Sequence, residues 1–188
     1  MKIRTLSTVF TLLVPFVMFL GAERMAAQTP QISNEDIQRE RRVFDFLIGD
    51  WVIEKSETPK GTEVGGDDEY KFERILDGSG IMANWHFNRG TKAKPDYTNA
   101  IYVSAFDNST KVWSFYYVSE RSAQWYEGRK ENGEWFFYKK LLVNGQDLLQ
   151  RQEWKLKDQS TLLRTIENSS DGGKTWIMGV VYTLKRKG

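Results

Sequence analysis

Three polar residues stand inside stretches rich in aromatic side chains: Asn84, Arg151 and Arg164. Where strands enclose a cavity, rings with a few convergent polar groups form the usual binding site for a small molecule. An arginine inside such a cavity favours an anionic head group such as a carboxylate, because the guanidinium donates two parallel hydrogen bonds. The alternative is that both arginines face solvent on an ordinary polar strand face. The candidate ligand-binding residues are these three and the aromatic residues Trp51, Tyr102, Tyr117 and Trp125.

Residue types suited to metal binding or nucleophilic catalysis are scarce. The chain has one histidine, His86, and no cysteine, which excludes the usual zinc ligand sets and any disulfide. A serine–histidine–aspartate triad would have to use His86, and no nucleophile-elbow sequence is present. The neighbours Asp67 and Asp68 fit a solvated loop, whereas acid–base chemistry by two strand carboxylates such as Glu73 and Glu153 stays open. We therefore assign no catalytic residue and no metal site.

A helix and a turn precede the first strand. Asn34 is the predicted N-cap, since it is followed by two carboxylates in the first turn, where they suit the helix dipole. Apolar residues at helical spacing predict one amphipathic helix over about 35–47. Gly49 then allows a turn, and Trp51 begins the first strand.

From Trp51 onward, apolar and polar residues alternate with a period of two. Asn132-Gly133 and Asn144-Gly145 are strong hairpin signals. About ten strands joined by short hairpins predict a mainly β fold, an antiparallel meander, and a long meander hides its edges most simply by closing into a barrel. A two-sheet sandwich is the alternative. A barrel of about ten strands has room for a small ligand inside.

The segment Ser169–Trp176 satisfies the Asp-box pattern of sialidase propeller blades. In that pattern the aspartate caps a tight hairpin, a glycine supplies a positive φ, and the tryptophan anchors the turn. One copy cannot form a propeller, which requires repeats at regular spacing. We therefore expect a structural role for these motif residues, as for those that open the first strand: Gly49, Trp51, Asp171, Gly173 and Trp176.

The N-terminal residues have the pattern of a secretory signal peptide. Lys2 and Arg4 precede an apolar run of about 14 residues, which is short for a membrane-spanning helix. We predict a signal peptide over 1–27, a polar linker over 28–33 and one domain over 34–188, in a protein exported to the periplasm or secreted. An uncleaved membrane anchor is the alternative. Without the leader the net charge is near zero, so nothing predicts nucleic-acid binding or stable membrane insertion.

Taken together, these features resemble the lipocalin-like (calycin) superfamily, in which a helix ending in an apolar-Gly-x-Trp sequence opens a meander barrel. More narrowly, the chain is similar to a family of exported bacterial proteins of unknown function that lies near the nitrobindin-type barrels. The resemblance implies a lipocalin-like barrel, and the family carries no agreed activity. The matching segments are Asp45–Trp51, Ile75–Gly78, Asn84-Trp85, Asp107–Trp113, Trp154 and Ser169–Trp176.

The resemblance also raises the question of haem. Nitrobindin-like relatives bind haem through a histidine near the C-terminal end of the barrel, and residues 173–188 contain none. Only His86, or in principle Tyr182, remains as an iron ligand, so we expect no cofactor. Our first hypothesis is a non-enzymatic exported barrel that binds a small apolar or amphipathic ligand. The alternatives are a haem protein or an enzyme on the same barrel, and an interaction module of the cell envelope.

Overall fold

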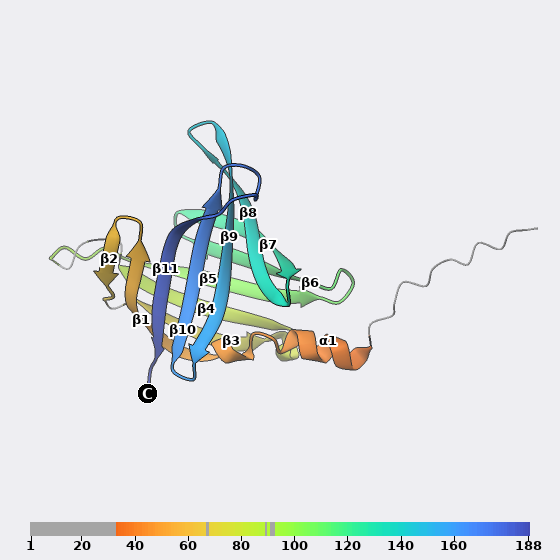
Figure 1. Cartoon of the computed structure of the whole chain (residues 1–188). Coiled ribbons are helices and arrows are strands. Elements are labelled where there is room, and N and C mark those ends of the chain that lie inside the picture. The colour runs from red at the N-terminus through yellow and green to blue at the C-terminus, as the bar shows by residue number, and fades with distance from the viewer. Residues whose placement is uncertain (1–32, 67, 89, 91–92) are drawn as a thin grey trace, which may run out of the picture. The chain divides into compact units, whose positions relative to one another are not determined.

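The computed structural model describes residues 33–66, 68–88, 90 and 93–188 (Figure 1). The predicted signal peptide over 1–27, and the linker over 28–33 except for Ser33, lie outside the described residues. The described ranges belong to one compact unit that runs to the C-terminus. No helix within these ranges is long and apolar enough to cross a membrane.

The unit is a closed antiparallel barrel of ten strands, to which a further short strand, β2, is added at β1. From β3 to β11 each strand pairs with the next one in sequence, and β11 pairs with β1 to close the barrel. The predicted mainly β meander barrel with one N-terminal helix is therefore confirmed, and the sandwich is excluded. The strands are β1 (Gly49–Thr58), β2 (Gly61–Val64), β3 (Glu69–Ile75), β4 (Gly80–Asn88), β5 (Tyr97–Asp107), β6 (Val112–Ser119), β7 (Ser122–Glu131), β8 (Glu134–Val143), β9 (Gln146–Asp158), β10 (Thr161–Ser169) and β11 (Ile177–Arg186).

Side-chain alternation gives each strand an inner and an outer face. In β4, Ile81, Ala83 and Phe87 are buried, whereas Asn84 and His86 are exposed. This is the pattern expected of a strand with one face toward a core.

The two Asn-Gly turns have the predicted conformation. Asn132 and Gly133 have φ of 51° and 88°, and Asn144 and Gly145 have φ of 52° and 78°. Positive φ at both central residues is what a type I′ hairpin turn requires, and asparagine and glycine reach it at the lowest cost. The hairpins β7–β8 and β8–β9 form at these positions.

The predicted helix over 35–47 is divided into α1 (Asn34–Arg41) and a 3-10 turn, η1 (Asp45–Leu47). Ser33, not Asn34, is the N-cap, because its hydroxyl accepts the backbone hydrogen bond of the third helical residue at 3.1 Å. A serine directly before the helix is well suited to accept this hydrogen bond from the first turn, which is why the cap lies one residue earlier than predicted.

Packing against the barrel explains why the helix ends early. Phe44 and Leu47 are both buried at the end of the barrel, and the ring of Phe44 lies 5.1 Å from Trp113 and 5.6 Å from Phe137. The indole N–H of Trp113 donates to the backbone oxygen of Glu40 at 3.2 Å. These contacts hold the residues after Arg41 against the end of the barrel in a 3-10 turn, so tertiary packing overrides the helical pattern here.

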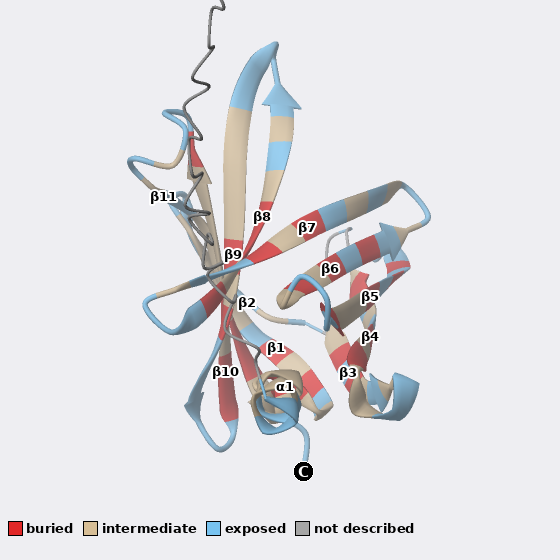
Figure 2. Ribbon diagram, turned by 90° about the vertical axis from the view of Figure 1, so that its right-hand side faces the viewer, coloured by how far each residue is buried: buried red, intermediate tan, exposed pale blue. Residues whose placement is uncertain are grey.

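The end of the barrel next to α1 is filled by side chains. Phe44, Leu47 and the rings of the surrounding strands leave an enclosed space of only ≈ 20 Å³. Such a space holds about one water molecule. Figure 2 shows buried residues on the strands around α1, in contrast to the exposed far end of the β8–β9 hairpin. A ligand inside the barrel therefore has no room at this end.

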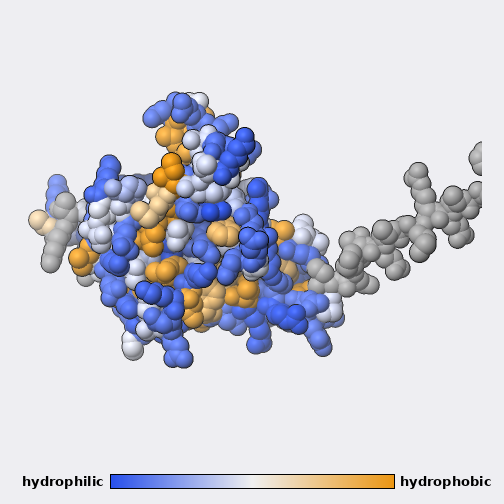
Figure 3. Space-filling model, viewed as in Figure 1, coloured by the Kyte–Doolittle hydropathy of each residue, from blue (hydrophilic) through white to orange (hydrophobic). Residues whose placement is uncertain are grey.

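At the opposite end of the barrel the wall is split between β7 and β8. Their ladder joins residues 127–131 to 134–138, so residues 122–126 and 139–143 do not pair with each other. Figures 1 and 2 show the β8–β9 hairpin diverging from β7. Leu142, near the end of this hairpin, is 73% exposed, and Figure 3 shows hydrophobic surface there.

Candidate functional site

The centre of the candidate site is Arg164, an arginine inside the barrel. Alternation along β10 places it on the inner face between Leu162 and Ile166, and it is 4% exposed. Its Nε and Nη2 groups donate to the side-chain oxygen of Gln152 at 3.0 and 2.8 Å, and Nη1 donates to the hydroxyl of Tyr70 at 2.9 Å. Three of the five guanidinium N–H groups are thereby used, and two remain for another acceptor.

Aromatic rings surround the Arg164 guanidinium. Burial alone would lower the pKa of Arg164, but the phenol groups of Tyr102 and Tyr70 raise it above its usual range, so the side chain is charged. None of the ion pairs within the described residues includes Arg164. The charge is instead stabilised by ring faces. The guanidinium carbon lies 5.0 to 5.8 Å from the ring centroids of Trp85, Tyr102, Trp154 and Tyr182.

Arg164 lines a hollow of ≈ 410 Å³ at the open end of the barrel. Two further cations border it, Lys139 and Arg121, and of these Arg121 pairs with Asp96 at 3.4 Å on the exposed rim. None of the described residues that line the hollow is a carboxylate. Its remaining lining residues are aromatic, apolar or neutral polar: Trp85, Tyr102, Tyr117, Tyr126, Tyr182, Ile166, Ser122, Gln124 and Gln150.

Lys139 is the second cation that faces the hollow without an acidic partner among the described residues. It follows Phe137 on the inner face of β8, donates its Nζ hydrogen bond to Gln124 and lies 4.8 Å from the ring centroid of Tyr126. Burial, and then the positive charge of Arg164, lower the pKa of Lys139 to about 8. At pH 7 Arg164 and Lys139 are therefore two positive charges that no carboxylate among the described lining residues balances.

The other polar groups of the hollow are neutral, and two donors nearby are unpaired. Burial raises the pKa of Tyr70 and Tyr102, and raises that of Tyr126 to about 12, so all three phenols keep their protons. Nε1 of Trp85 and Nε2 of Gln152 are buried without a hydrogen-bond partner among the described residues. A buried unpaired donor costs free energy, so both favour a ligand that brings acceptor atoms.

The structure brings together three of the predicted ligand-binding residues, Tyr102, Tyr117 and Arg164. The rings of Tyr102 and Tyr117 are 5.1 Å apart on the adjacent strands β5 and β6. All three line the same hollow.

Trp51 also faces inward but lies elsewhere, in the core. It is fully buried, its indole N–H donates to the backbone oxygen of Leu47 at 2.7 Å, and the guanidinium of Arg186 lies 4.2 Å from its ring centroid. Gly49 has φ of 123°, and a Cβ there would lie 2.6 Å from Arg186. The two residues thus fix the start of β1 and do not contact the hollow.

Asn84, Trp125 and Arg151 lie on the outer face of the barrel, at the outward positions of their strands. Arg151 donates to Glu167 at 2.7 Å and lies 4.2 Å from the ring centroid of Trp176. Their side chains point away from the interior, so they cannot contact a ligand held there. The sequence alone did not say which of the two arginines faces inward.

The Asp-box segment forms a hairpin turn between β10 and β11. The carboxylate of Asp171 accepts hydrogen bonds from the backbone N–H groups of Lys174 and Thr175 at 3.0 Å and from the Thr175 hydroxyl at 2.6 Å. These bonds hold the pKa of Asp171 well below its usual range, with the Thr175 hydroxyl as the first cause. Gly173 has φ of 93°, and Trp176 packs under Arg151.

His86 lies on the outer face of β4. Its Nδ1 is 3.0 Å from the side-chain oxygen of Asn99, and its ring stacks on Tyr97 with centroids 5.0 Å apart. A haem bound through His86 would therefore lie outside the barrel. Within the described ranges no three histidine, cysteine or acidic residues gather as a metal site.

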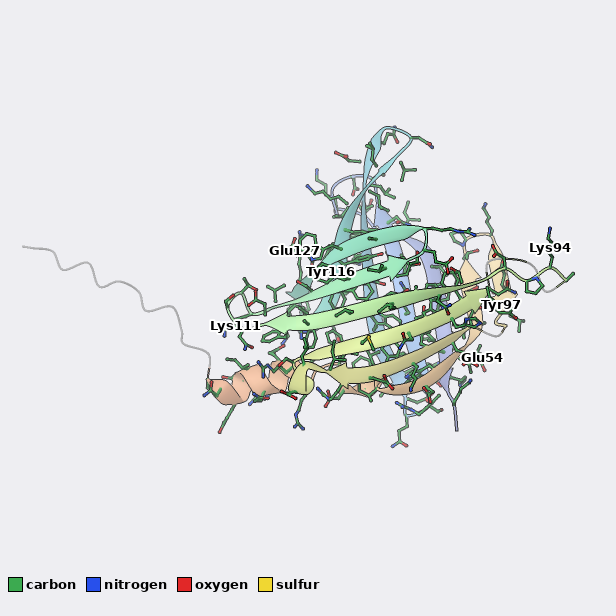
Figure 4. The ribbon with its side chains drawn as sticks, turned by 180° about the vertical axis from the view of Figure 1, so that it is seen from behind. Glu54, Lys94, Tyr97, Lys111, Tyr116 and Glu127 are labelled. Carbon is green, nitrogen blue, oxygen red and sulfur yellow. The ribbon has the colours of Figure 1, made fainter. Side chains whose placement is uncertain are left out.

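The outer face of β5, β6 and β7 carries exposed apolar side chains. Tyr116 is 49% exposed and pairs across the ladder with Trp125, which is 53% exposed, and Ile101 pairs with Val118. Figure 4 labels Tyr116 and Glu127 on this face. These side chains point away from the hollow and contribute nothing to it.

The sequence did not predict several residues of the site, among them Lys139, Gln152 and Tyr126. Lys139 directly follows four aromatic residues, Trp135 to Tyr138. Because these residues make both faces of the strand aromatic, the period of two does not indicate which face points inward. The available signal was the register through the Asn132-Gly133 turn, which places Phe137 and Lys139 on one face.

Comparisons with known proteins yield no family. No known family model matches the chain, and no curated protein matches it. Among solved structures it is similar to an S-type phycobiliprotein lyase, CPES, from Guillardia theta. The two are 11% identical, the match covers 84% of this chain and 99% of the lyase chain, and the TM-score is 0.48. At this level of similarity neither a family nor a function follows.

Proposed function

We propose that this protein binds a small amphipathic anion in the hollow at the open end of its barrel. The single observation that carries the proposal is that Arg164 and Lys139 both line this hollow and that none of its described lining residues is a carboxylate. A carboxylate head group at these two cations would supply the missing negative charge. The apolar body of the ligand would then lie against the aromatic wall.

The hydrogen-bond inventory supports an anionic head group with two or more acceptor atoms. Arg164 has two N–H groups beyond those that bind Gln152 and Tyr70, and the indole N–H of Trp85 is unpaired among the described residues. Charge-assisted hydrogen bonds contribute about 1.5–3 kcal/mol each, more than neutral ones. A neutral ligand of the same shape would use the rings but leave the charges uncompensated.

The volume of the hollow limits the size of the ligand. The ≈ 410 Å³ available lies in the range of about 300–1,000 Å³ that is typical of small-molecule sites. Because the end next to α1 is filled, the ligand cannot extend through the barrel. A longer apolar body would instead leave through the split between β7 and β8.

The proposal includes export. Its support is the basic and then apolar N-terminal sequence over 1–27, together with the resemblance to exported lipocalin-like proteins. Mass spectrometry of the protein recovered from its own cells tests it. A mature N-terminus near residue 28 supports export, and a full-length chain retained in the cytoplasm contradicts it.

The binding proposal is tested by comparing octanoate with octanol, two ligands of equal chain length that differ in charge. Calorimetric titration of the wild-type protein at pH 7 should give a dissociation constant for octanoate at least tenfold lower than for octanol. Equal affinities, or no binding of octanoate, would overturn the proposal.

A further inference from the structure

Lys139 differs from the other lysines of the barrel in its surroundings. Its side chain lies inside the hollow, among rings, while its neighbour Lys140 is exposed on the outer face. No ion pair within the described residues includes Lys139, whereas Lys130 and Lys155 both pair with glutamates. Among the described residues, its Nζ donates a hydrogen bond to the neutral amide of Gln124.

We infer that Lys139 is a nucleophilic lysine that forms an imine with apolar aldehydes entering the hollow. The inference rests on the proposed function in one respect, that small amphipathic molecules enter this hollow. It goes further by naming a second chemical class, aldehydes, and a covalent step. A lysine is activated in this way when it is desolvated or placed next to another cation, and Lys139 meets both conditions.

The charged groups around Lys139 favour the neutral amine. Arg164 on β10 is the cation that faces it across the hollow, and Arg121 stands at the rim. On the outer side of the wall Glu127 and Lys139 both line a second hollow, where the Glu127 carboxylate accepts a hydrogen bond from Arg129 at 3.4 Å. Among the described residues that line the hollow, no carboxylate holds the proton on Nζ.

The reaction balances without any oxidant or reductant. The Lys139 ammonium first releases a proton to water. The Nζ lone pair then attacks the aldehyde carbon, and the carbonyl oxygen takes up a proton to give a carbinolamine. Loss of that oxygen as water leaves a carbon–nitrogen double bond, so aldehyde plus amine gives imine plus water. The aromatic wall holds the alkyl chain, which raises the local concentration of the aldehyde.

The expected selectivity follows from the neutral fraction of each amine. With its pKa lowered to about 8, Lys139 is neutral about two hundred times more often at pH 7.5 than an exposed lysine near 10.4. A less basic amine is a weaker nucleophile, by about tenfold over this interval if the slope is similar to that of thiols. Lys139 should therefore react about tenfold faster than an exposed lysine, or more, even before binding of the alkyl chain is considered.

The test uses octanal and sodium cyanoborohydride, which reduces an imine to a stable amine, on the full mature protein at pH 7.5. Peptide mapping should find Lys139 alkylated at least tenfold faster than any other lysine, with a rate that levels off above pH about 8. Lys139→Arg should abolish the fast adduct, and Lys140→Arg, the matched control on the outer face, should keep it. Adducts spread evenly over exposed lysines would overturn the inference, and this readout on the wild-type protein does not depend on how any variant folds.

An added octanoate arm separates this inference from the proposed function. If octanoate slows the formation of the Lys139 adduct, the imine inference and the anion proposal both stand. If octanoate binds by calorimetry but Lys139 reacts like an exposed lysine, the imine inference fails and the binding proposal stands. If Lys139 reacts fast and octanoate neither binds nor protects, the imine inference stands and the anion proposal fails.

Discussion

Replacing Arg164 by methionine should remove the preference of the hollow for an anion. Methionine is flexible, apolar and uncharged, so it keeps part of the packing among the rings while deleting all five N–H donors. The replacement avoids the cost of burying a charge but leaves the Gln152 oxygen without its two donors, so the variant should fold with reduced stability. Circular dichroism and a thermal melt check that it does.

The magnitude follows from the hydrogen bonds available to the ligand. Two N–H groups of Arg164 remain after those to Gln152 and Tyr70. At about 1.5 kcal/mol for each charge-assisted bond, the lower end of the usual range, the loss is about 3 kcal/mol. That corresponds to an increase of about a hundredfold in the dissociation constant of octanoate. The dissociation constant of octanol should change by less than about threefold.

Arg151 provides the matched control. It lies on the adjacent strand β9 but on the outer face, where it pairs with Glu167. Arg151→Met makes the same chemical change and should leave octanoate binding within about twofold, measured by calorimetry under the same conditions. The reasoning is refuted if Arg164→Met folds and still binds octanoate as the wild type does, or if both variants lose binding equally.

Three other predictions follow from the same contacts. Octanoate affinity should be highest below pH 8 and fall as the pH rises through about 8, because Lys139 then loses its proton and no longer attracts the bound anion. Calorimetry at several pH values checks this. The Lys139→Gln variant should show a flatter pH profile than the wild type. Phe44→Ala should lower the free energy of unfolding by about 3–5 kcal/mol in urea titrations, because it empties the filled end of the barrel; a loss below about 1 kcal/mol would contradict that packing. The pKa of Asp171 is lowered in the folded protein, so its carboxylate stabilises the fold above the unfolded pKa of about 3.9. This contribution is lost as the pH falls toward the folded pKa. The free energy of unfolding of Asp171→Ala should therefore be lower than that of the wild type at pH 6, and the difference should be smaller at pH 2.

The barrel was predictable because its signals are local. Alternation along β4 and the two Asn-Gly turns each fix their own strands and hairpins, and short hairpins in series leave few topologies. The exact helix was not predictable, because the position where α1 ends depends on how Phe44 meets Trp113 and Phe137, which are far away in sequence.

The candidate site was predicted only in part, since inward and outward assignment depends on register. Arg151 and Arg164 look alike in sequence, yet one faces Glu167 outside and the other Gln152 inside. The bulges in β1 and β10 shift the register by a residue, and such a shift reverses the face of every side chain beyond it. Lys139 lay outside the prediction because the four residues before it are aromatic on both faces of the strand, so periodicity did not assign its side.

The most direct test of the central claim is the ionisation of a bound carboxylate. Octanoate labelled with carbon-13 at its carboxyl group can be titrated by NMR while it is bound to the protein. If Arg164 and Lys139 hold the head group, the pKa of the bound carboxyl should fall below about 3, at least one unit under the value of about 4.3 for an exposed carboxyl side chain. A bound carboxyl whose pKa is unchanged or raised would show that the head group lies away from the two cations, and would contradict the account.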